Sequence, residues 1–251
     1  MQAFQSFYSK EIESYLPDDV FSEVYRYALF PTGKLFRPEL FLTLCQDLNL
    51  ELSEREYFIA MALEVHHTYT LIHDDLPCMD NDDMRRGRAS THKKFNEWQA
   101  LLAADGLLNL SYQLLAKAND IKLIQIFSDL TGPQGLIQGQ ALDLKKKKKS
   151  FQDYLYMHEL KTARLMQACT MISAHLTKQN LNDFSKLGKT IGMIFQLLDD
   201  KDDQNEEENI FKNYAKEAHE YLDKMMSEMK VLLDKYQLKR TQEFLEKYYL
   251  K

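Results

Sequence analysis

Two clusters of aspartates each follow an apolar stretch, at residues 74–80 (DDLPCMD) and residues 199–203 (DDKDD). Two carboxylates about 4 Å apart repel each other by roughly 4 kcal/mol at an effective dielectric constant near 20, so such clusters need a counter-charge. Carboxylate oxygens suit Mg²⁺, which is bound by a few of them together with water and phosphate oxygens. Either cluster alone could be surface acid, but two clusters that each close an apolar segment favour a metal site.

The place of the first cluster also indicates a cation. Pro77 stops or bends a helix, because its ring clashes with the preceding turn. Asp74 and Asp75 therefore lie at the carboxyl end of an apolar helix. The helix macrodipole is negative there, so a divalent cation is the simple compensation.

The second cluster has a helical arrangement, because residues three and four apart are neighbours on a helix. One face carries Gln196, Asp199 or Asp200, and Asp203. The preceding residues 191–198 are too apolar for a freely exposed helix. We therefore expect these aspartates at the inner mouth of a cavity.

Several basic residues stand where they could hold phosphate groups. Lys34 and Arg37 come just before Pro38, which suits the first position of a helix, and helix N-termini attract anions. Arg can grip a phosphate through two parallel hydrogen bonds, whereas Lys adds a point charge. The other candidates are Arg85, Arg86, Lys161 and its neighbour Thr162. Each cation taken singly is more simply a solvated surface charge. The spacing of His66, His67 and His73 does not predict a zinc site.

The elements that must position these residues all have helical period. Residues 53–56 (SERE) and 150–153 (SFQD) have the pattern of a capping box, which marks a helix start. A long helix is predicted to carry Lys161, and another to span residues 182–203. No window alternates in β-branched residues, so no strand is predicted. The sequence therefore predicts an all-α protein.

Composition limits the function classes. A chain of 251 residues can bury a core, and a net charge of −6 argues against generic nucleic-acid binding. Three widely spaced cysteines fit a reducing cytosol. No apolar stretch has the length of a membrane span, and the N-terminus lacks the pattern of a signal peptide. We expect a cytoplasmic protein with no nucleic-acid partner and no membrane span.

Five segments in order resemble those of one known family, the short-chain trans-isoprenyl diphosphate synthases, most closely the bacterial farnesyl diphosphate synthases. Residues 64–87 (EVHHTYTLIHDDLPCMDNDDMRRG) resemble their first aspartate-rich region, and residues 195–203 (FQLLDDKDD) resemble the second. The remaining matches are residues 33–38 (GKLFRP), residues 139–144 (GQALDL) and the pair Lys161-Thr162.

The resemblance implies the isoprenoid synthase fold, a single all-α domain over residues 1–251 in which long helices surround a deep central cavity. It also implies three Mg²⁺ ions on an allylic diphosphate. Their ligands would be Asp74, Asp75, Asp80, Asp199, Asp200 and Asp203. The groups that contact the allylic substrate or stabilise its departing diphosphate would be Arg85, Lys161, Thr162 and Gln196. Isopentenyl diphosphate would be held by Lys34, Arg37, His67 and Arg86.

The activity implied by the resemblance is a Mg²⁺-dependent head-to-tail condensation of isopentenyl diphosphate with dimethylallyl or geranyl diphosphate, giving farnesyl diphosphate. The alternative is a geranylgeranyl or longer-chain polyprenyl synthase, or a non-catalytic subunit of one. Two intact aspartate motifs count against the subunit, and a second set of diphosphate-binding cations counts against a terpene cyclase. The family usually forms homodimers, so a homodimer is expected.

Product length would depend on the fifth and fourth residues before Asp74, which are Tyr69 and Thr70. A bulky ring at this position would form the floor of the tunnel and favour a C15 product.

One segment departs from the family pattern. A glycine- and lysine-containing loop usually follows the second motif, whereas here Asp203 runs through residues 204–209 (QNEEEN) into Ile210. Either this chain is a truncated or inactive relative of the family, or the protein has further loop residues that this sequence lacks.

Overall fold

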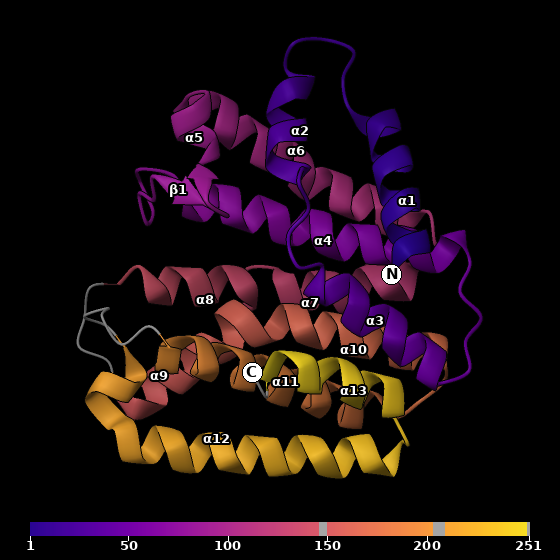
Figure 1. The fold of residues 1–251 in the computed structure, drawn as a ribbon, viewed down its shortest axis with the longest axis vertical. Helices are drawn as coiled ribbons and strands as arrows, with labels where there is room; N and C mark the ends of the chain where they lie inside the picture. The colour runs from indigo at the N-terminus through magenta and orange to yellow at the C-terminus, as the bar shows by residue number, and fades with distance from the viewer. Residues whose placement is uncertain (146–149, 203–208, 250–251) are drawn as a thin grey trace. The chain divides into compact units, whose positions relative to one another are not determined.

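The computed structural model describes residues 1–145, 150–202 and 209–249 (Figure 1). The chain divides into two compact units. Unit 1 comprises residues 1–39 and 52–124, and unit 2 comprises residues 40–51 and 125–251. Helices α3 (Phe36–Asp47) and α7 (Ile121–Thr131) each begin in unit 1 and end in unit 2. Whether the two units form the single domain expected from the sequence stays a prediction.

Unit 1 is built around α4 (Glu54–Asp74), which packs against α6 (Glu97–Ala116). The middle of α4 is apolar on nearly all sides and is buried from Ile59 to His66. The other elements of unit 1 are α1 (Gln2–Glu11), the 3₁₀ helix η1 (Ile12–Tyr15), α2 (Ser22–Leu29), β1 (Met84–Arg85), β2 (Arg88–Ala89) and α5 (Thr91–Lys94). The two short strands pair antiparallel in register Arg85 to Arg88.

Unit 2 contains three helices that pack in sequence, α10 (Arg164–Leu176) on α11 (Leu181–Asp202) and α11 on α12 (Ile210–Lys235). Its other elements are α8 (Leu136–Asp143), α9 (Phe151–His158), the π-helical segment η2 (Glu159–Ala163) and α13 (Lys239–Tyr249). None of the helices in the described ranges combines the length and the apolar character that a membrane crossing demands.

Several local predictions are confirmed. The all-α class holds, and both predicted capping boxes are present, at Ser53 with Glu56 and at Ser150 with Asp153. Helix α11 ends at Asp202, within a residue of the predicted boundary.

Three local predictions are wrong in detail. A strand pair does exist, because the two-residue loop Arg86-Gly87 takes positive φ angles and closes a hairpin. Pro38 is the third residue of α3 instead of the first, a position where its missing N–H still costs no helical bond. The long helix predicted to carry Lys161 is interrupted there by η2.

The π-helical segment η2 is held between two glycines on neighbouring helices. A Cβ atom on Gly139 of α8 would lie 2.2 Å from the backbone nitrogen of Lys161. A Cβ atom on Gly192 of α11 would lie 2.4 Å from the Cα atom of Ala163. Both contacts are with backbone, which cannot turn aside. The backbone around Lys161 and Thr162 is therefore fixed by close packing on two sides.

We expect Gly139→Ala and Gly192→Ala each to lower the free energy of unfolding by about 1–3 kcal/mol, the usual range for overpacking a well-packed site. Urea denaturation followed by circular dichroism measures this change. The matched control is Gly106→Ala on α6, where the new Cβ atom would meet the hydroxyl end of the Tyr25 side chain, which can move. An equal loss in the Gly106 variant would show that backbone packing around η2 is not the cause.

Candidate active site

The first aspartate motif turns back on itself after α4. The N–H of Asp80 donates to the carbonyl of Asp74 at 2.9 Å, and the N–H of Asn81 donates to the carbonyl of Leu76 at 3.1 Å. Asn81 has a φ of 57°, which lets the chain make this turn. The turn brings Asp80 beside Asp74, although five residues separate them in the sequence.

The two adjacent aspartates of this motif have different surroundings. Asp74 is partly exposed, whereas Asp75 is only 2% exposed and its carboxylate is bound by Arg85. The Nε–H of Arg85 donates to Asp75 at 2.8 Å, and the guanidinium also bonds Asp82 at 2.9 Å. Burial raises the pKa of Asp75, and the Arg85 contact opposes that shift. The structure therefore places Asp75 as the partner of Arg85.

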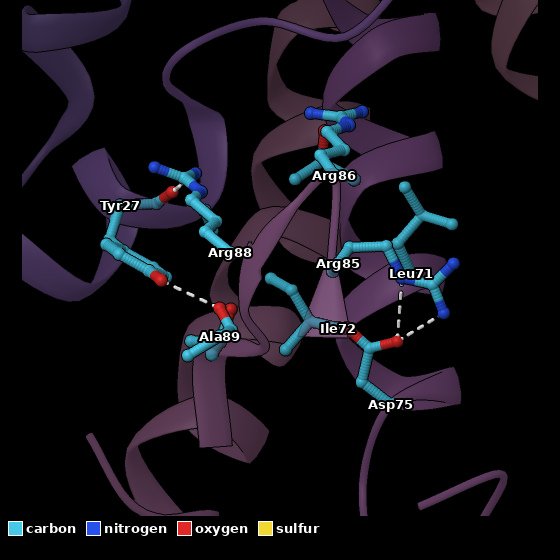
Figure 2. Close-up of a pocket in the computed structure, with 11 residues that line it drawn as sticks. Tyr27, Leu71, Ile72, Asp75, Arg85, Arg86, Arg88 and Ala89 are labelled. Carbon is cyan, nitrogen blue, oxygen red and sulfur yellow. Dashed lines mark hydrogen bonds and ion pairs between the residues drawn. The ribbon is translucent and has the colours of Figure 1, made fainter. Parts of the chain in front are cut away.

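A second set of contacts anchors the hairpin that carries Arg85 and Arg86. The Arg88 guanidinium lies 4.1 Å from the centre of the Tyr27 ring and donates to the Tyr27 carbonyl. The Tyr27 hydroxyl donates in return to the carbonyl of Ala89 at 2.7 Å (Figure 2). These residues line a small pocket of about 30 Å³ that also reaches Asp75 and Arg85. The hairpin is thus fastened to α2 on one side and to α4 on the other.

Two of the predicted isopentenyl diphosphate residues, Arg37 and Arg86, form a cluster with a buried carboxylate, Glu64, which motif reasoning did not single out. Glu64 is 3% exposed, and its carboxylate lies 3.8 Å from the guanidinium of Arg86. Burial raises the pKa of Glu64, whereas the nearby Arg37 and Arg86 lower it. A Cβ atom on Gly33 would clash with the Arg86 guanidinium at 2.6 Å, so Gly33 makes room for that side chain.

The other two predicted isopentenyl diphosphate residues, Lys34 and His67, have different surroundings. Lys34 is exposed, directly after Gly33. Burial, followed by the charges of Arg37 and Arg86, holds the pKa of His67 well below its usual value. The His67 ring is therefore neutral at physiological pH and can donate one hydrogen bond to a phosphate oxygen without adding charge.

In unit 2, the predicted residues form a connected chain of side chains. The Thr162 hydroxyl donates to the side-chain oxygen of Gln196 at 2.8 Å, and the side-chain nitrogen of Gln196 donates to one carboxylate oxygen of Asp200 at 2.8 Å. Lys161 pairs with Asp143 of α8, and Asp199 lies exposed at the surface. Asp203, the last predicted ligand, lies outside the described residues.

Sequence reasoning missed two close partners in unit 2. His158 lies with its Nε2 atom 3.1 Å from the second oxygen of Asp200, and Asp143 pairs with Lys161. Asp143 falls inside the GQALDL match, and His158 stands three residues before Lys161. Their positions, one inside a matched motif and one close to another, were the only signal in the sequence that could have marked them as site residues.

The donor set fits a hard divalent cation. Asp74, Asp80 and Asp199 are partly or fully exposed carboxylates, and oxygen donors open to solvent are what Mg²⁺ shares with water and phosphate oxygens. In the described part of the chain, no group of three or more potential ligands among His, Cys, Asp and Glu is arranged to hold an ion.

Comparisons with known proteins agree with this chemistry. The family model described as polyprenyl synthetase matches residues 18–222. A farnesyl diphosphate synthase of Geobacillus stearothermophilus is 34% identical over 213 residues, covering 79% of this chain and 71% of that relative.

Two solved structures are similar over nearly the whole chain. A geranyltranstransferase of Thermotoga maritima is 32% identical with a TM-score of 0.88, covering 97% of this chain and 95% of that one. A geranyltransferase of Helicobacter pylori, complexed with magnesium and isoprenyl diphosphate, is 26% identical with a TM-score of 0.83, covering 98% of this chain and 97% of that one.

Proposed function

Because this chain belongs to the polyprenyl synthetase family and is therefore a prenyltransferase, we propose that it condenses isopentenyl diphosphate head-to-tail with dimethylallyl or geranyl diphosphate, giving farnesyl diphosphate. One observation carries the proposal. In each unit, one carboxylate of an aspartate motif is held by a side-chain hydrogen bond, Asp75 by Arg85 and Asp200 by Gln196, and another aspartate of the same motif is partly or fully exposed.

In unit 1, the allylic diphosphate is bound through Asp74, Asp80 and Arg85. The two aspartates supply oxygen ligands for Mg²⁺, and Arg85 donates N–H groups to phosphate oxygens. Asp75 acts through Arg85, because the guanidinium already engages its buried carboxylate. A fixed guanidinium loses little freedom when it binds, which strengthens its hold on the diphosphate.

In unit 2, Asp199 supplies a ligand oxygen for Mg²⁺, and the remaining predicted groups bind diphosphate oxygens. The Lys161 ammonium and the Gln196 amide are donors suited to phosphate oxygens, and the Thr162 hydroxyl, which donates to Gln196, orients that amide. Asp200 and Asp203 complete the second carboxylate set as the sequence predicts it. We propose three bound Mg²⁺ ions in the complex with substrate.

Isopentenyl diphosphate is bound in this proposal by the cluster around Glu64. Lys34, Arg37 and Arg86 neutralise its charge, and the neutral His67 ring donates one hydrogen bond. The buried carboxylate of Glu64 keeps the cluster from carrying an unbalanced positive charge in the absence of substrate.

The chemistry requires no nucleophile from the protein. Mg²⁺, when bound, neutralises charge that develops on the leaving diphosphate. Arg85 in unit 1 and Lys161 in unit 2 are each cations of the kind that stabilises negative charge on diphosphate oxygens as an allylic C–O bond ionises. The double bond of isopentenyl diphosphate then forms the new C–C bond, and a proton passes to the released diphosphate.

Incubation with dimethylallyl diphosphate, labelled isopentenyl diphosphate and Mg²⁺ is expected to give a labelled C15 diphosphate, sized by chromatography after phosphatase treatment. Addition of EDTA in excess of Mg²⁺ should abolish the product. Absence of any condensation with Mg²⁺ present would refute the proposed function, whereas C20 or longer products would favour the geranylgeranyl or polyprenyl alternative.

Product length is proposed to depend on Tyr69. Its ring is 2% exposed and lies edge-on to His66 and His73, with ring centres 4.6 and 5.6 Å apart. Thr70 is half-buried, and its hydroxyl donates to the carbonyl of His67 at 2.8 Å. Neighbouring rings hold the Tyr69 ring in place, so it is a rigid candidate for the floor of the product tunnel.

Tyr69→Ala is expected to shift the main product from C15 to C20 or longer, because it removes a ring that limits chain growth. The same chromatographic sizing measures the shift. Tyr69→Phe is the control, since it keeps the ring and should keep the C15 product. If the alanine variant made only C15, Tyr69 would not set the length.

We propose that the chain forms a homodimer through α6. The exposed side of this helix carries three large apolar residues in its first two turns, Trp98, Leu101 and Leu102, which are 58%, 44% and 50% exposed. Phe21 stacks on Trp98 with the ring planes 2° apart and extends the apolar surface. Apolar groups gathered in this way indicate a protein contact.

The double variant Leu101→Asp/Leu102→Asp should convert the dimer to a monomer, because it would bury two charges in the contact. Light scattering coupled to size-exclusion chromatography gives the mass. Val231→Asp on α12, also at an exposed apolar residue, should leave the mass unchanged. A monomeric wild-type chain at micromolar concentration would contradict the proposal.

A further inference from the structure

The end of α9 brings a buried histidine against the second aspartate motif. His158 is the last residue of α9 and is 4% exposed. Its Nε2 atom lies 3.1 Å from Oδ2 of Asp200, whose side chain is 12% exposed. No motif match or predicted substrate contact includes this residue.

His158 completes the set of contacts around the Asp200 carboxylate. The Oδ1 atom of Asp200 accepts a hydrogen bond from the Gln196 side-chain amide, and the side-chain oxygen of Gln196 accepts one from the Thr162 hydroxyl. The Nε2 atom of His158 lies 3.1 Å from the other oxygen, a close contact that lacks the angle of a hydrogen bond, so the carboxylate has side-chain neighbours on two sides. The resulting chain runs from Thr162 through Gln196 and Asp200 to His158, and three of its four members belong to the proposed diphosphate site.

The surroundings of His158 and of the Asp200 backbone are also ordered. The Tyr154 ring lies one turn earlier on α9, with its centre 6.1 Å from that of His158. Asn209, which caps the start of α12, donates from its side chain to the backbone carbonyl of Asp200 at 2.6 Å. The backbone of Asp200 is thereby fixed independently of His158, so a change at His158 acts on the carboxylate orientation.

We propose that His158 is a positioning residue for diphosphate binding: it fixes the Asp200 carboxylate, which in turn fixes Gln196 and the adjacent Asp199. The inference rests on the proposed function. Without His158, the Asp200 carboxylate can turn about its side-chain bonds, and the Gln196 amide loses a fixed acceptor. Groups that orient ligand side chains in this way typically change affinity by about 10-fold to 100-fold.

Two polar replacements of similar size give the sharpest test. Glutamine carries its amide nitrogen close to the position of histidine Nε2, whereas the amide nitrogen of asparagine falls near Nδ1 and stops short of Asp200. Isothermal titration calorimetry with inorganic diphosphate at saturating Mg²⁺ measures binding without turnover. We expect His158→Asn to weaken binding by about 10-fold and His158→Gln to stay within about threefold of wild type.

A steady-state measurement supplies a second readout. The KM for isopentenyl diphosphate should change less than twofold in both variants, since the Glu64 cluster does not include His158. His219→Leu is the control, because His219 lies exposed on α12 of the same unit. It should bind diphosphate like wild type.

A double-mutant cycle separates positioning from a general structural effect. If His158 acts through Asp200, the losses in His158→Asn and Asp200→Asn should not add in the combined variant. Equal diphosphate affinity in wild type and His158→Asn, or fully additive losses, would overturn the inference. Failure of the wild-type chain to bind diphosphate with Mg²⁺ would instead count against the proposed function.

Discussion

A carboxylate that is removed from water is stable only when a cation or several donors meet it, and three acidic side chains of this protein impose that condition. Asp75 is met by Arg85, Glu64 lies beside Arg86 and near Arg37, and Asp200 is met by Gln196 and His158. Most of these partner side chains, namely Arg85, Arg86, Arg37 and Gln196, are also the ones expected to contact substrate. The two buried acids, Asp75 and Glu64, and the largely covered Asp200 therefore order the donors before any diphosphate binds.

Close backbone packing fixes the position of Lys161 and Thr162 before any ligand binds. A π-helical turn adds one residue to the helical repeat and changes the direction in which its side chains project. Such a turn is costly unless neighbours hold it, and the absence of side chains at Gly139 and Gly192 lets two helices approach its backbone. The Gly in the GQALDL segment thus has a packing reason that is independent of any ligand.

Local signals in the sequence were sufficient for much of the fold. A capping box involves residues three apart, so residues 53–56 and 150–153 marked two helix starts that the structure confirms. The resemblance named the residues that now lie around Glu64 and around Asp200. It could not say that Asp75 turns inward while Asp74 stays partly exposed, since that depends on the hairpin that carries Arg85.

The partners that were missed share a physical cause. His158 and Asp200 are 42 positions apart, and their contact depends on how α9 packs against α11. Periodicity and motif spacing describe neighbours along one element, so they carry no information on such a pair. The π-helical turn was hidden for a related reason, because its cause lies in glycines on two other helices.

The β1–β2 hairpin after the first aspartate motif directs two adjacent arginines to two places far apart along α4. Arg85 and Arg86 are adjacent, yet they are paired with acids eleven positions apart on the same chain segment, Asp75 and Glu64. That separation is roughly 16 Å along a helix axis. Arg85 lies on the strand and points to the end of α4, whereas Arg86 takes a φ of 54° in the turn and reaches back along α4. A left-handed residue next to a strand residue changes the side-chain direction sharply. Two neighbouring cations can therefore pair with two separate carboxylates, Asp75 and Glu64.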